Sequence, residues 1–380
     1  MIVQWTSDLL FVTACLGCLY LATAAAMTLR FRGHQPPSTH GKPVPVTILK
    51  PLHREGPRIF RCLASFCRQR YPAPVQIVFG VEEPTDPAVA LVKQLQAAFP
   101  DCAIELRIGA RGHGGNRKIS NLANIAGGAD HDVLVLADSD IEVDPDYLAR
   151  VVRELRQPGV GAVTCLYHGV SGTSVSARLS ALTINAQFLP NVILAVTCTF
   201  AQPCFGATIA LRREMLAKIG GLEQFGDSLA DDYSVGEAVR SKGDEVVISP
   251  VSVGHLCKDQ TAQELCSQEL RWARTIRAID PLGYFGSIIT HPFPLAVLAA
   301  LTGSGGAVAL AAIAVLCRII LLKCVERRFG LERQPYWLVP FRDLMSFAIF
   351  VWSLFGTSVN WNGETYRVTP QGTLVRRTVS

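Results

Sequence analysis

The chain has 380 residues, of which 49% are hydrophobic and 18% charged, and its mean hydropathy of +0.28 is high for a soluble protein. Its formal net charge is only +5 and its basic residues are spread along the chain, which argues against a nucleic-acid partner. The twelve cysteines follow no metal-ligand or disulfide spacing, so we expect small, reduced, apolar side chains. Part of the chain is therefore expected to lie in a bilayer.

The first apolar segment, Leu9–Leu29, has 21 residues without a charge. This length is sufficient to cross a hydrocarbon core of about 30 Å. A cleaved signal peptide is the competing interpretation, but the residues before the segment include Asp8 and no basic side chain. Arg30, Arg32 and Lys42 follow it, so the positive-inside rule predicts an outside amino terminus and a cytoplasmic chain from Arg30 onward.

The region from Val44 to about Asp280 alternates between strand and helix patterns, which is typical of an α/β domain. The expected strands are Val44–Leu49, Val75–Val81, Ile104–Ile108, Val133–Ala137, Gly161–Leu166, Ala207–Leu211 and Val246–Ser249. Expected helices include residues 87–99, 145–156 and 262–278. No repeat or low-complexity linker divides the region, so we expect one domain over residues 44–280.

The carboxyl-terminal quarter is apolar again. No Asp, Glu, Lys or Arg occurs from Pro281 to Cys317, and TGSGG at residues 302–306 interrupts the run. The run therefore holds either two membrane passes or an interfacial helix and one pass, and Leu344–Val359 offers a further, shorter pass. We expect an anchor at residues 1–30, two or three passes within residues 281–360, and a cytoplasmic or otherwise extramembrane tail at residues 361–380.

A candidate metal site follows the buried-strand pattern VLVLA, where Asp138 and Asp140 emerge with their side chains on the same face. Two carboxylates so placed suit a hard divalent ion, Mg²⁺ or Mn²⁺, that also needs phosphate oxygens and water. The alternative to metal binding is a structural role, in which an acid of this motif caps a helix beside a turn. His255, which follows another expected strand, is a candidate third metal ligand, an acceptor contact or a structural side chain.

Two further motifs contain side chains that can form hydrogen bonds with a nucleotide. The acidic turn after Val75–Val81 contains Glu83 and Asp86, which can accept hydrogen bonds from a base or ribose, or can simply be solvated acids at a helix start. The glycine-rich segment GGNRKISNL carries Asn116 and Lys118 into a helix and can donate hydrogen bonds to a nucleotide, although Gly-Gly is also ordinary turn chemistry.

The segment LADDYSVGEAVRSKG predicts a helix that begins with the paired acids Asp231 and Asp232. Acids are common at helix starts, where they interact favourably with the helix dipole. A carboxylate that faces a sugar carbon can instead remove the proton of an acceptor hydroxyl as a general base.

The motif QELRW supplies Gln268, Arg271 and Trp272 on an expected helix. Arg271, Arg274 and Arg277 recur at every third position and predict a basic face directed at phosphates or lipid headgroups. Trp272 suits the rim of an acceptor slot at the membrane interface.

Together with VTILKPLHREGP, NRKISNL, GATIALRREML and WNGETYRV, these motifs resemble the ceramide glucosyltransferase family, family 21 of the inverting glycosyltransferases. The resemblance implies a Rossmann-like GT-A domain, with Asp138 and Asp140 as metal ligands and Asp232 as the catalytic base. It implies nucleotide-sugar contacts from Glu83, Asp86, Asn116, Lys118, Asp138, Gln268, Arg271 and Trp272, with the choice of nucleoside-binding acid open between Glu83 and Asp86.

The implied reaction is transfer of one hexose from a UDP-sugar to a lipid hydroxyl by a single displacement. Two segments resemble the hopanoid-biosynthesis branch of the family: LASFCRQRYPAPVQIVFGV and ELRWARTIRAIDPLGY. This resemblance implies transfer of N-acetylglucosamine to bacteriohopanetetrol at a bacterial inner membrane. Transfer of glucose to ceramide is the alternative within the family. A processive polysaccharide synthase and a non-catalytic nucleotide-sugar sensor are the alternatives outside it.

Overall fold

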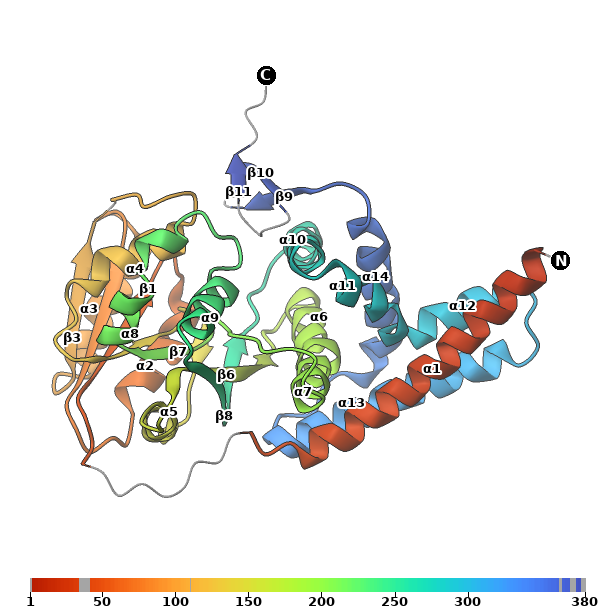
Figure 1. The fold of residues 1–380 in the computed structure, drawn as a ribbon, viewed down its shortest axis with the longest axis horizontal. Helices are drawn as coiled ribbons and strands as arrows, with labels where there is room; N and C mark the ends of the chain where they lie inside the picture. Colours follow the sequence, from red (N-terminus) through yellow and green to blue (C-terminus); the bar gives the residue numbers. More distant parts are fainter. Residues whose placement is uncertain (1, 34–41, 110, 362–363, 370–373, 377–380) are drawn as a thin grey trace. The chain divides into compact units, whose positions relative to one another are not determined.

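The computed structural model describes residues 2–33, 42–109, 111–361, 364–369 and 374–376 (Figure 1). The chain forms two compact units, which we describe separately. The α/β unit comprises Arg32–His168 and Gln202–Leu256, and the helical unit comprises Met1–Phe31, Gly169–Ala201 and Cys257–Ser380. The expected domain at residues 44–280 thus includes two segments, Gly169–Ala201 and the chain after Leu256, that fold with the helical unit.

A mixed sheet forms the centre of the α/β unit, and its order is β3-β2-β1-β4-β7-β6-β8-β5. The strands β1, β2, β3 and β4 are parallel to one another, whereas β7 is antiparallel to both β4 and β6, and β5 is antiparallel to β8. Within the described residues the strands are β1 (Val46–Pro51), β2 (Val75–Val81), β3 (Ala103–Ile108), β4 (Val133–Leu136), β5 (Ile141–Glu142), β6 (Val160–Val170), β7 (Ile209–Arg212) and β8 (Glu245–Leu256).

Helices cover both faces of this sheet because successive strand residues point to opposite sides. Ile48 of β1 packs in one apolar cluster with α2, α3 and α5, whereas its neighbour Leu49 packs in a second cluster with α4, α8 and α9. The helices are α2 (Phe60–Cys67), α3 (Pro87–Ala98), α4 (Arg117–Ala126), α5 (Tyr147–Leu155), α8 (Arg213–Lys218) and α9 (Asp231–Ser241), with short 3₁₀ turns at Pro57–Ile59 and Glu223–Phe225. The sequence-based expectation of an α/β unit with these strands is confirmed.

The pairing of β4 with β7 brings two distant loops together. Leu136, the last residue of β4, pairs with Ile209, the first residue of β7. Because the two strands are antiparallel, the chain that leaves β4 runs beside the chain that enters β7. Asp138 and Gly206 therefore become neighbours, although 68 positions separate their numbers.

The helical unit is built around long apolar helices. Its elements are α1 (Ile2–Arg30), α6 (Val175–Thr183), the π-helical turn η2 (Ile184–Phe188), α7 (Leu189–Thr197), α10 (Ala262–Ile279), α11 (Pro281–Gly286), η4 (Ser287–Thr290), α12 (Pro292–Leu301), α13 (Ala307–Phe329), η5 (Tyr336–Leu338), α14 (Val339–Ser353), β9 (Ser358–Trp361), β10 (Glu364–Val368) and β11 (Leu374–Arg376). Leu21 and Ala24 of α1 are buried together with Leu321 of α13.

Among the described residues, three helices are long and apolar enough to cross a membrane: Gln4–Arg30, Val175–Thr197 and Ala307–Phe329. The pair Pro281–Thr290 and Pro292–Leu301 is bent by 67° and gives a fourth candidate if it counts as one span. The amino-terminal and carboxyl-terminal membrane helices confirm the sequence-based expectation, whereas Val175–Thr197 was not expected. The shorter pass expected near Leu344–Val359 corresponds to α14, which has 15 residues.

Candidate active site

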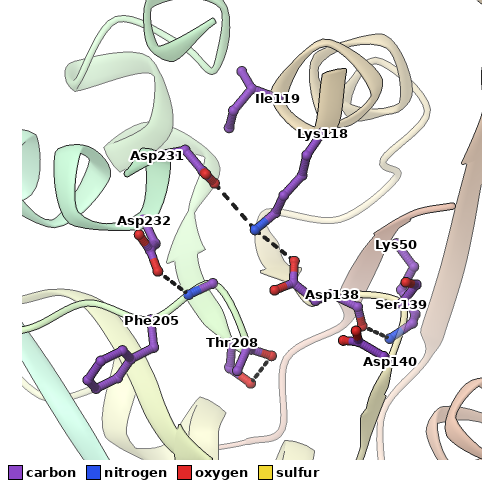
Figure 2. Close-up of polar contacts among 12 residues, drawn as sticks. Lys50, Lys118, Ile119, Asp138, Ser139, Asp140, Phe205, Thr208, Asp231 and Asp232 are labelled. Atoms are coloured by element: carbon purple, nitrogen blue, oxygen red, sulfur yellow. Dashed lines mark hydrogen bonds and ion pairs between the residues drawn. The ribbon is translucent and has the colours of Figure 1, made fainter. Parts of the chain in front are cut away.

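The two acids of the D-x-D motif lie in the loop directly after β4, and buried polar contacts fix this loop. The Lys50 ammonium at the end of β1 donates to the Asp138 carbonyl oxygen at 2.8 Å and lies 3.7 Å from the centre of the Phe66 ring (Figure 2). The Ser139 hydroxyl donates to Glu55 Oε1 at 2.6 Å. These contacts hold the backbone of the loop and leave the Asp138 carboxylate available to Lys118.

Lys118 bridges two acids that come from different elements. Asn116 caps α4 by accepting from the Ile119 N–H at 3.1 Å, which places Lys118 in the first turn of that helix. Its ammonium lies 2.7 Å from Asp138 Oδ1 and 3.3 Å from Asp231 Oδ2 (Figure 2). The Asn116 amide also donates to Asp231 Oδ1 at 3.3 Å, so the starts of α4 and α9 are joined by polar contacts.

Both oxygens of Asp232 accept backbone hydrogen bonds. The Gly206 N–H donates to Oδ2 at 2.9 Å, and the Tyr233 N–H donates to Oδ1 at 2.8 Å (Figure 2). These bonds fix the direction of the carboxylate at the start of α9 while leaving lone pairs on each oxygen for a further partner.

Gly206 lies at the centre of the cluster, where a side chain would require Lys118 to move. A Cβ atom at this position would lie 2.6 Å from Lys118 Nζ, 3.3 Å from Asp138 Oδ2 and 3.6 Å from Asp232 Oδ2. The three charged groups therefore meet within a few ångströms of one backbone position. The segment GATIALRRE gave no sequence signal for this role, and Lys50 was likewise not among the candidate residues.

The pKa values follow from burial and from the neighbouring charges. Burial raises the pKa of Asp232 to about 6, with a further increase from Asp231, and Lys118 offsets part of this. Burial also raises the pKa of Asp138, against the opposing effect of Lys118. Burial lowers the pKa of Lys118, but the surrounding carboxylates more than reverse this and keep it charged. Burial lowers the pKa of Lys50 to about 8.

The donor set fits a divalent cation that is completed by substrate. Five carboxylates interact with the two ammonium groups of Lys50 and Lys118, so the cluster has excess negative charge; they belong to Glu55, Asp138, Asp140, Asp231 and Asp232. Among the described residues, no three His, Cys, Asp or Glu side chains form a ligand group by themselves. Mg²⁺-type ions are commonly held by one or two carboxylates together with substrate phosphates and water, which matches this arrangement.

His255 and Asp140 lie close enough to act on the same ion. The Nδ1 atom of His255, on β8, lies 3.5 Å from Asp140 Oδ1. Its ring also packs against Tyr167, with a centroid separation of 5.7 Å. The residue is thus held by packing and lies beside one of the candidate metal ligands.

The acids of the first motif have different surroundings. Asp86 caps α3: its carboxylate accepts from the Ala88 N–H at 2.8 Å and from the Arg54 N–H at 2.9 Å. Glu83 is exposed and lines an open pocket of about 280 Å³ together with His53, Arg54, Glu82, Thr85, Asp86 and Pro87. Glu83 is therefore the acid whose carboxylate is directed to solvent, and Asp86 supports the turn.

The QELRW motif lies on α10 in the helical unit, where Gln268, Arg271 and Trp272 are partly buried. The expectation that Arg274 and Arg277 face phosphates or lipid headgroups is wrong. Both donate to carbonyl oxygens of the segment that follows α14: Arg274 to Phe355 at 2.8 Å and to Ser358, and Arg277 to Leu354 at 2.8 Å and Gly356 at 2.6 Å. These arginines thus fix the chain between α14 and β9 against α10.

The sequence as a whole matches one family model. Residues 9–374 match Glycosyl transferase family 21, which is nearly the whole chain. The chain belongs to glycosyl transferase family 21. This confirms the resemblance read from the motifs.

The curated proteins to which the chain is similar are distant in sequence. Ceramide glucosyltransferase 3 of Caenorhabditis elegans is 23% identical over 266 residues, covering 70% of this chain and 58% of that protein. Ceramide glucosyltransferase of Gibberella zeae is 28% identical over 179 residues, covering 43% and 34%. An N-acetylglucosaminyltransferase of Rhizobium leguminosarum bv. viciae is 29% identical over 122 residues, covering 32% and 28%. The matched parts span about half the length of these relatives or less.

A solved structure shares the fold of this family 21 protein. Mannosyltransferase PcManGT from Pyrobaculum calidifontis, in complex with GDP-Man and Mn²⁺, superposes with a TM-score of 0.57 at 21% identity and covers 93% of this chain and 99% of its own. At this level of identity the likeness concerns the fold alone. The expected GT-A fold is confirmed.

Proposed function

We propose that this family 21 protein is a UDP-sugar-dependent hexosyltransferase that moves one sugar to a hydroxyl group of a membrane lipid, with inversion at the anomeric carbon. The observation that carries the proposal is the cluster of Asp138, Asp231 and Asp232 around Gly206 and Lys118. This cluster occurs in a chain that also has apolar helices of membrane-spanning length.

Asp232 is the proposed general base. A pKa of about 6 leaves it largely ionised at neutral pH yet more basic than an ordinary carboxylate, as a proton acceptor requires. Asp232 takes the proton of the acceptor hydroxyl as that oxygen forms its bond to the anomeric carbon, and the bond to UDP breaks with the electron pair leaving on the diphosphate. The backbone N–H groups of Gly206 and Tyr233 orient the carboxylate during this step.

Asp138 and Asp140 are the proposed residues that hold Mg²⁺ or Mn²⁺, with His255 as a third candidate ligand. The Mn²⁺ named with PcManGT supports a divalent cation in this fold. When bound, such an ion neutralises charge that develops on the leaving diphosphate. Lys118, held by Asp138 and Asp231, adds a fixed positive charge for the same phosphates.

The remaining donor contacts follow from the family resemblance. Gln268, Arg271 and Trp272 retain the roles that it implies. The side chain of Asn116 is fully buried and bonds to the Ile119 N–H, the Ser228 carbonyl and Asp231, so its proposed role is to position Lys118 and not to contact the donor. Of the two acids of the first motif, Glu83 is favoured for the nucleoside because it is exposed in a pocket, whereas the carboxylate of Asp86 is occupied by backbone N–H groups.

We propose N-acetylglucosamine as the sugar that is transferred and bacteriohopanetetrol as the acceptor lipid. The two sequence segments that resemble the hopanoid-biosynthesis branch support this assignment, as does the similarity to a rhizobial N-acetylglucosaminyltransferase. Glucose transfer to ceramide is the second candidate, supported by the ceramide glucosyltransferases among the relatives. Both acceptors present a hydroxyl on an apolar body at a bilayer surface.

The proposed location is a bacterial inner membrane with the catalytic residues on the cytoplasmic side. Within the helical unit, Arg328 Nε at the end of α13 donates to the Phe31 carbonyl after the end of α1 at 2.7 Å. Basic residues Arg30, Arg327 and Arg328 therefore gather at the same end of two apolar helices. The positive-inside rule assigns that end to the cytoplasm.

The decisive experiment uses membranes that carry the full chain. They are incubated with UDP-N-acetylglucosamine or UDP-glucose and with bacteriohopanetetrol or ceramide, in the presence of Mg²⁺, Mn²⁺ or EDTA, and the lipids are analysed by mass spectrometry. We expect one N-acetylhexosamine on the hopanoid, formed with either metal and lost in EDTA.

The other outcomes discriminate among the alternatives. A hexose on ceramide would move the protein to the second candidate, and a polymer would indicate a processive synthase. No product with any combination, in membranes that contain the folded protein, would contradict the transferase proposal.

A further inference from the structure

A buried ion pair holds α10, the helix that carries the QELRW motif. Glu269, inside the motif, is 6% exposed, and Arg342 of α14 is 2% exposed. The Arg342 guanidinium donates to both carboxylate oxygens of Glu269, at 2.9 Å and 2.5 Å. This bidentate geometry fixes both the distance between the two side chains and their relative direction.

Neighbouring hydroxyl groups complete the hydrogen bonding of the pair. The Thr183 hydroxyl donates to Glu269 Oε1 at 2.9 Å, and Arg342 donates to the Ser346 hydroxyl at 3.0 Å and 2.7 Å. Charges buried among apolar helices require such full pairing, since an unpaired charge there is very unfavourable. A pair of apolar side chains would fill the same space without this requirement, so the ion pair is better explained by the geometry it specifies than by stability.

Because Glu269 lies inside the QELRW motif, the direction of its side chain also determines the directions of the other motif side chains. Successive residues of an α-helix are rotated by about 100°, so fixing the direction of one side chain fixes that of its neighbours. Gln268 precedes Glu269, and Arg271 and Trp272 follow it within one turn. Any rotation of α10 about its axis would redirect all three motif side chains together.

A second attachment prevents such rotation. Arg277 lies about two turns beyond Glu269 on α10 and donates to the Leu354 and Gly356 carbonyls, which directly follow α14. Helix α10 is thus attached at two levels along its length, first to Arg342 of α14 and then to the segment that follows α14.

We propose that Arg342 is a positioning residue for the QELRW motif: through its bidentate bond to Glu269 it fixes the rotation of α10 and thereby the directions of Gln268, Arg271 and Trp272. The role in catalysis rests on the proposed function, because it assumes that these three side chains act on the sugar donor. The attachment itself does not depend on that assumption.

The same unit offers a matched control. Arg318 of α13 and Asp343 of α14 form an ion pair at 3.2 Å and are 0% and 1% exposed. Arg318 also donates to the Ala186 carbonyl at 2.9 Å and to the Thr290 carbonyl. These contacts do not involve α10. Asp343 is linked to Ser346, a partner of Arg342, through the Gln187 amide, but an Asn at position 343 keeps an oxygen that can accept from Gln187, so this substitution perturbs an equally buried charge without releasing the motif helix.

The experiment compares Glu269→Gln, Arg342→Lys and Asp343→Asn in the full chain, purified in lipid nanodiscs and normalised to folded protein. Hydrogen–deuterium exchange of residues 262–279 reports on α10 without any turnover. Steady-state kinetics with UDP-N-acetylglucosamine report KM and kcat for the donor.

We expect faster exchange in α10 and a donor KM raised about tenfold, a coupling in the range usual for residues in contact, for Glu269→Gln and Arg342→Lys. Asp343→Asn should lower thermal stability without changing either readout. Equal effects of all three variants on KM and on α10 exchange would overturn the proposal, because the pair would then be only a stabilising contact.

Failure of the proposed function would have a different signature. If the wild-type chain transfers no sugar, faster α10 exchange confined to Glu269→Gln and Arg342→Lys would still support the attachment and would contradict only its link to the donor. Unchanged α10 exchange in these two variants would overturn the attachment whatever the activity.

Discussion

At the scale of single residues, the candidate site depends on a position that has no side chain. Gly206 lets Lys118, Asp138 and Asp232 approach one another and donates its own N–H to Asp232. The D-x-D motif could be found in the sequence because it follows a buried strand pattern. Gly206 could not be found, since its importance arises only when β7 pairs with β4.

Substitution of Gly206 by Ala should reduce transfer by at least about tenfold, because a Cβ atom 2.6 Å from Lys118 Nζ forces that ammonium out of its bridge between Asp138 and Asp231. Gly56→Ala is the matched control, because no heavy atom lies within 4 Å of a Cβ atom built there. Initial rates of transfer are measured at saturating donor. Equal rates for the two variants would contradict the displacement of Lys118 by a Cβ atom at position 206.

Substitution of Asp232 by Asn should abolish transfer while UDP still binds, because the carboxylate acts on the acceptor hydroxyl. The pKa of about 6 lies above the usual carboxyl value, so the ionised form is destabilised by folding and stability is lost as pH rises from about 4 to 6. At pH 7 the neutral amide removes this electrostatic cost, but its NH2 group cannot accept from one of the backbone N–H groups of Gly206 and Tyr233, so we expect little net change in the melting temperature. Calorimetric UDP titration and thermal unfolding measure the two effects, and lost UDP binding would refute the assignment.

The pH dependence of transfer follows from the same group. A general base must be deprotonated, so kcat should fall about tenfold per pH unit below about 6 and level off above it. Rates between pH 4.5 and 8, with protein integrity checked at each pH, give the profile. A rate that rises as the pH falls through 6 would exclude Asp232 as the base.

At the scale of elements, the structure reassigns a basic helix face. The spacing of Arg271, Arg274 and Arg277 predicted a surface for phosphate or lipid, but Arg274 and Arg277 bind carbonyl oxygens of the segment that follows α14. Sequence periodicity identifies which residues share a face, but it does not identify what that face contacts. Only the packing of α10 against α14 supplies this information.

Substitution of Arg277 by Gln should lower the melting temperature by about 2–4 °C, because charged hydrogen bonds to the Leu354 and Gly356 carbonyls are lost. In lipid nanodiscs, the effect of anionic lipid on the melting temperature should be the same for this variant and for the wild type. Arg178→Gln, at an exposed position on α6, is the control. A variant that keeps its stability in neutral lipid but loses the effect of anionic lipid would restore the lipid-facing interpretation.

The seven strands expected in the α/β unit are present because their alternating or continuous apolar patterns match strands with covered faces. The apolar helix at Val175–Thr197 escaped the sequence analysis for a physical reason. Its mean hydropathy of 1.5 is below the 2.0 and 2.5 of the other two long helices. It contains Asn185 and Gln187, whose amides contact Gly169 and Asp343 in the interior of the unit.

At the scale of the whole molecule, the basic ends of α1 and α13 predict a single orientation. An epitope tag at the amino terminus should be cut by protease added to intact spheroplasts, whereas a tag inserted after Gly330 should be cut only after lysis. A tag at the opposite end of α13, between Thr302 and Gly306, should behave like the amino-terminal tag. The reverse pattern would place the catalytic residues outside.

The division of the chain has a consequence for how the protein is made. Asp138 and Asp140 leave the ribosome before the apolar helix Val175–Thr197, and Gly206 and Asp232 leave after it. At about 5–20 residues per second, the two halves of the acid cluster are synthesised roughly 5–20 s apart. During that interval β4 lacks its partner β7 and is an open sheet edge that can pair with other chains. Delivery of the intervening helix must therefore precede completion of the sheet, and a nascent chain stalled before residue 206 would be both inactive and prone to aggregate.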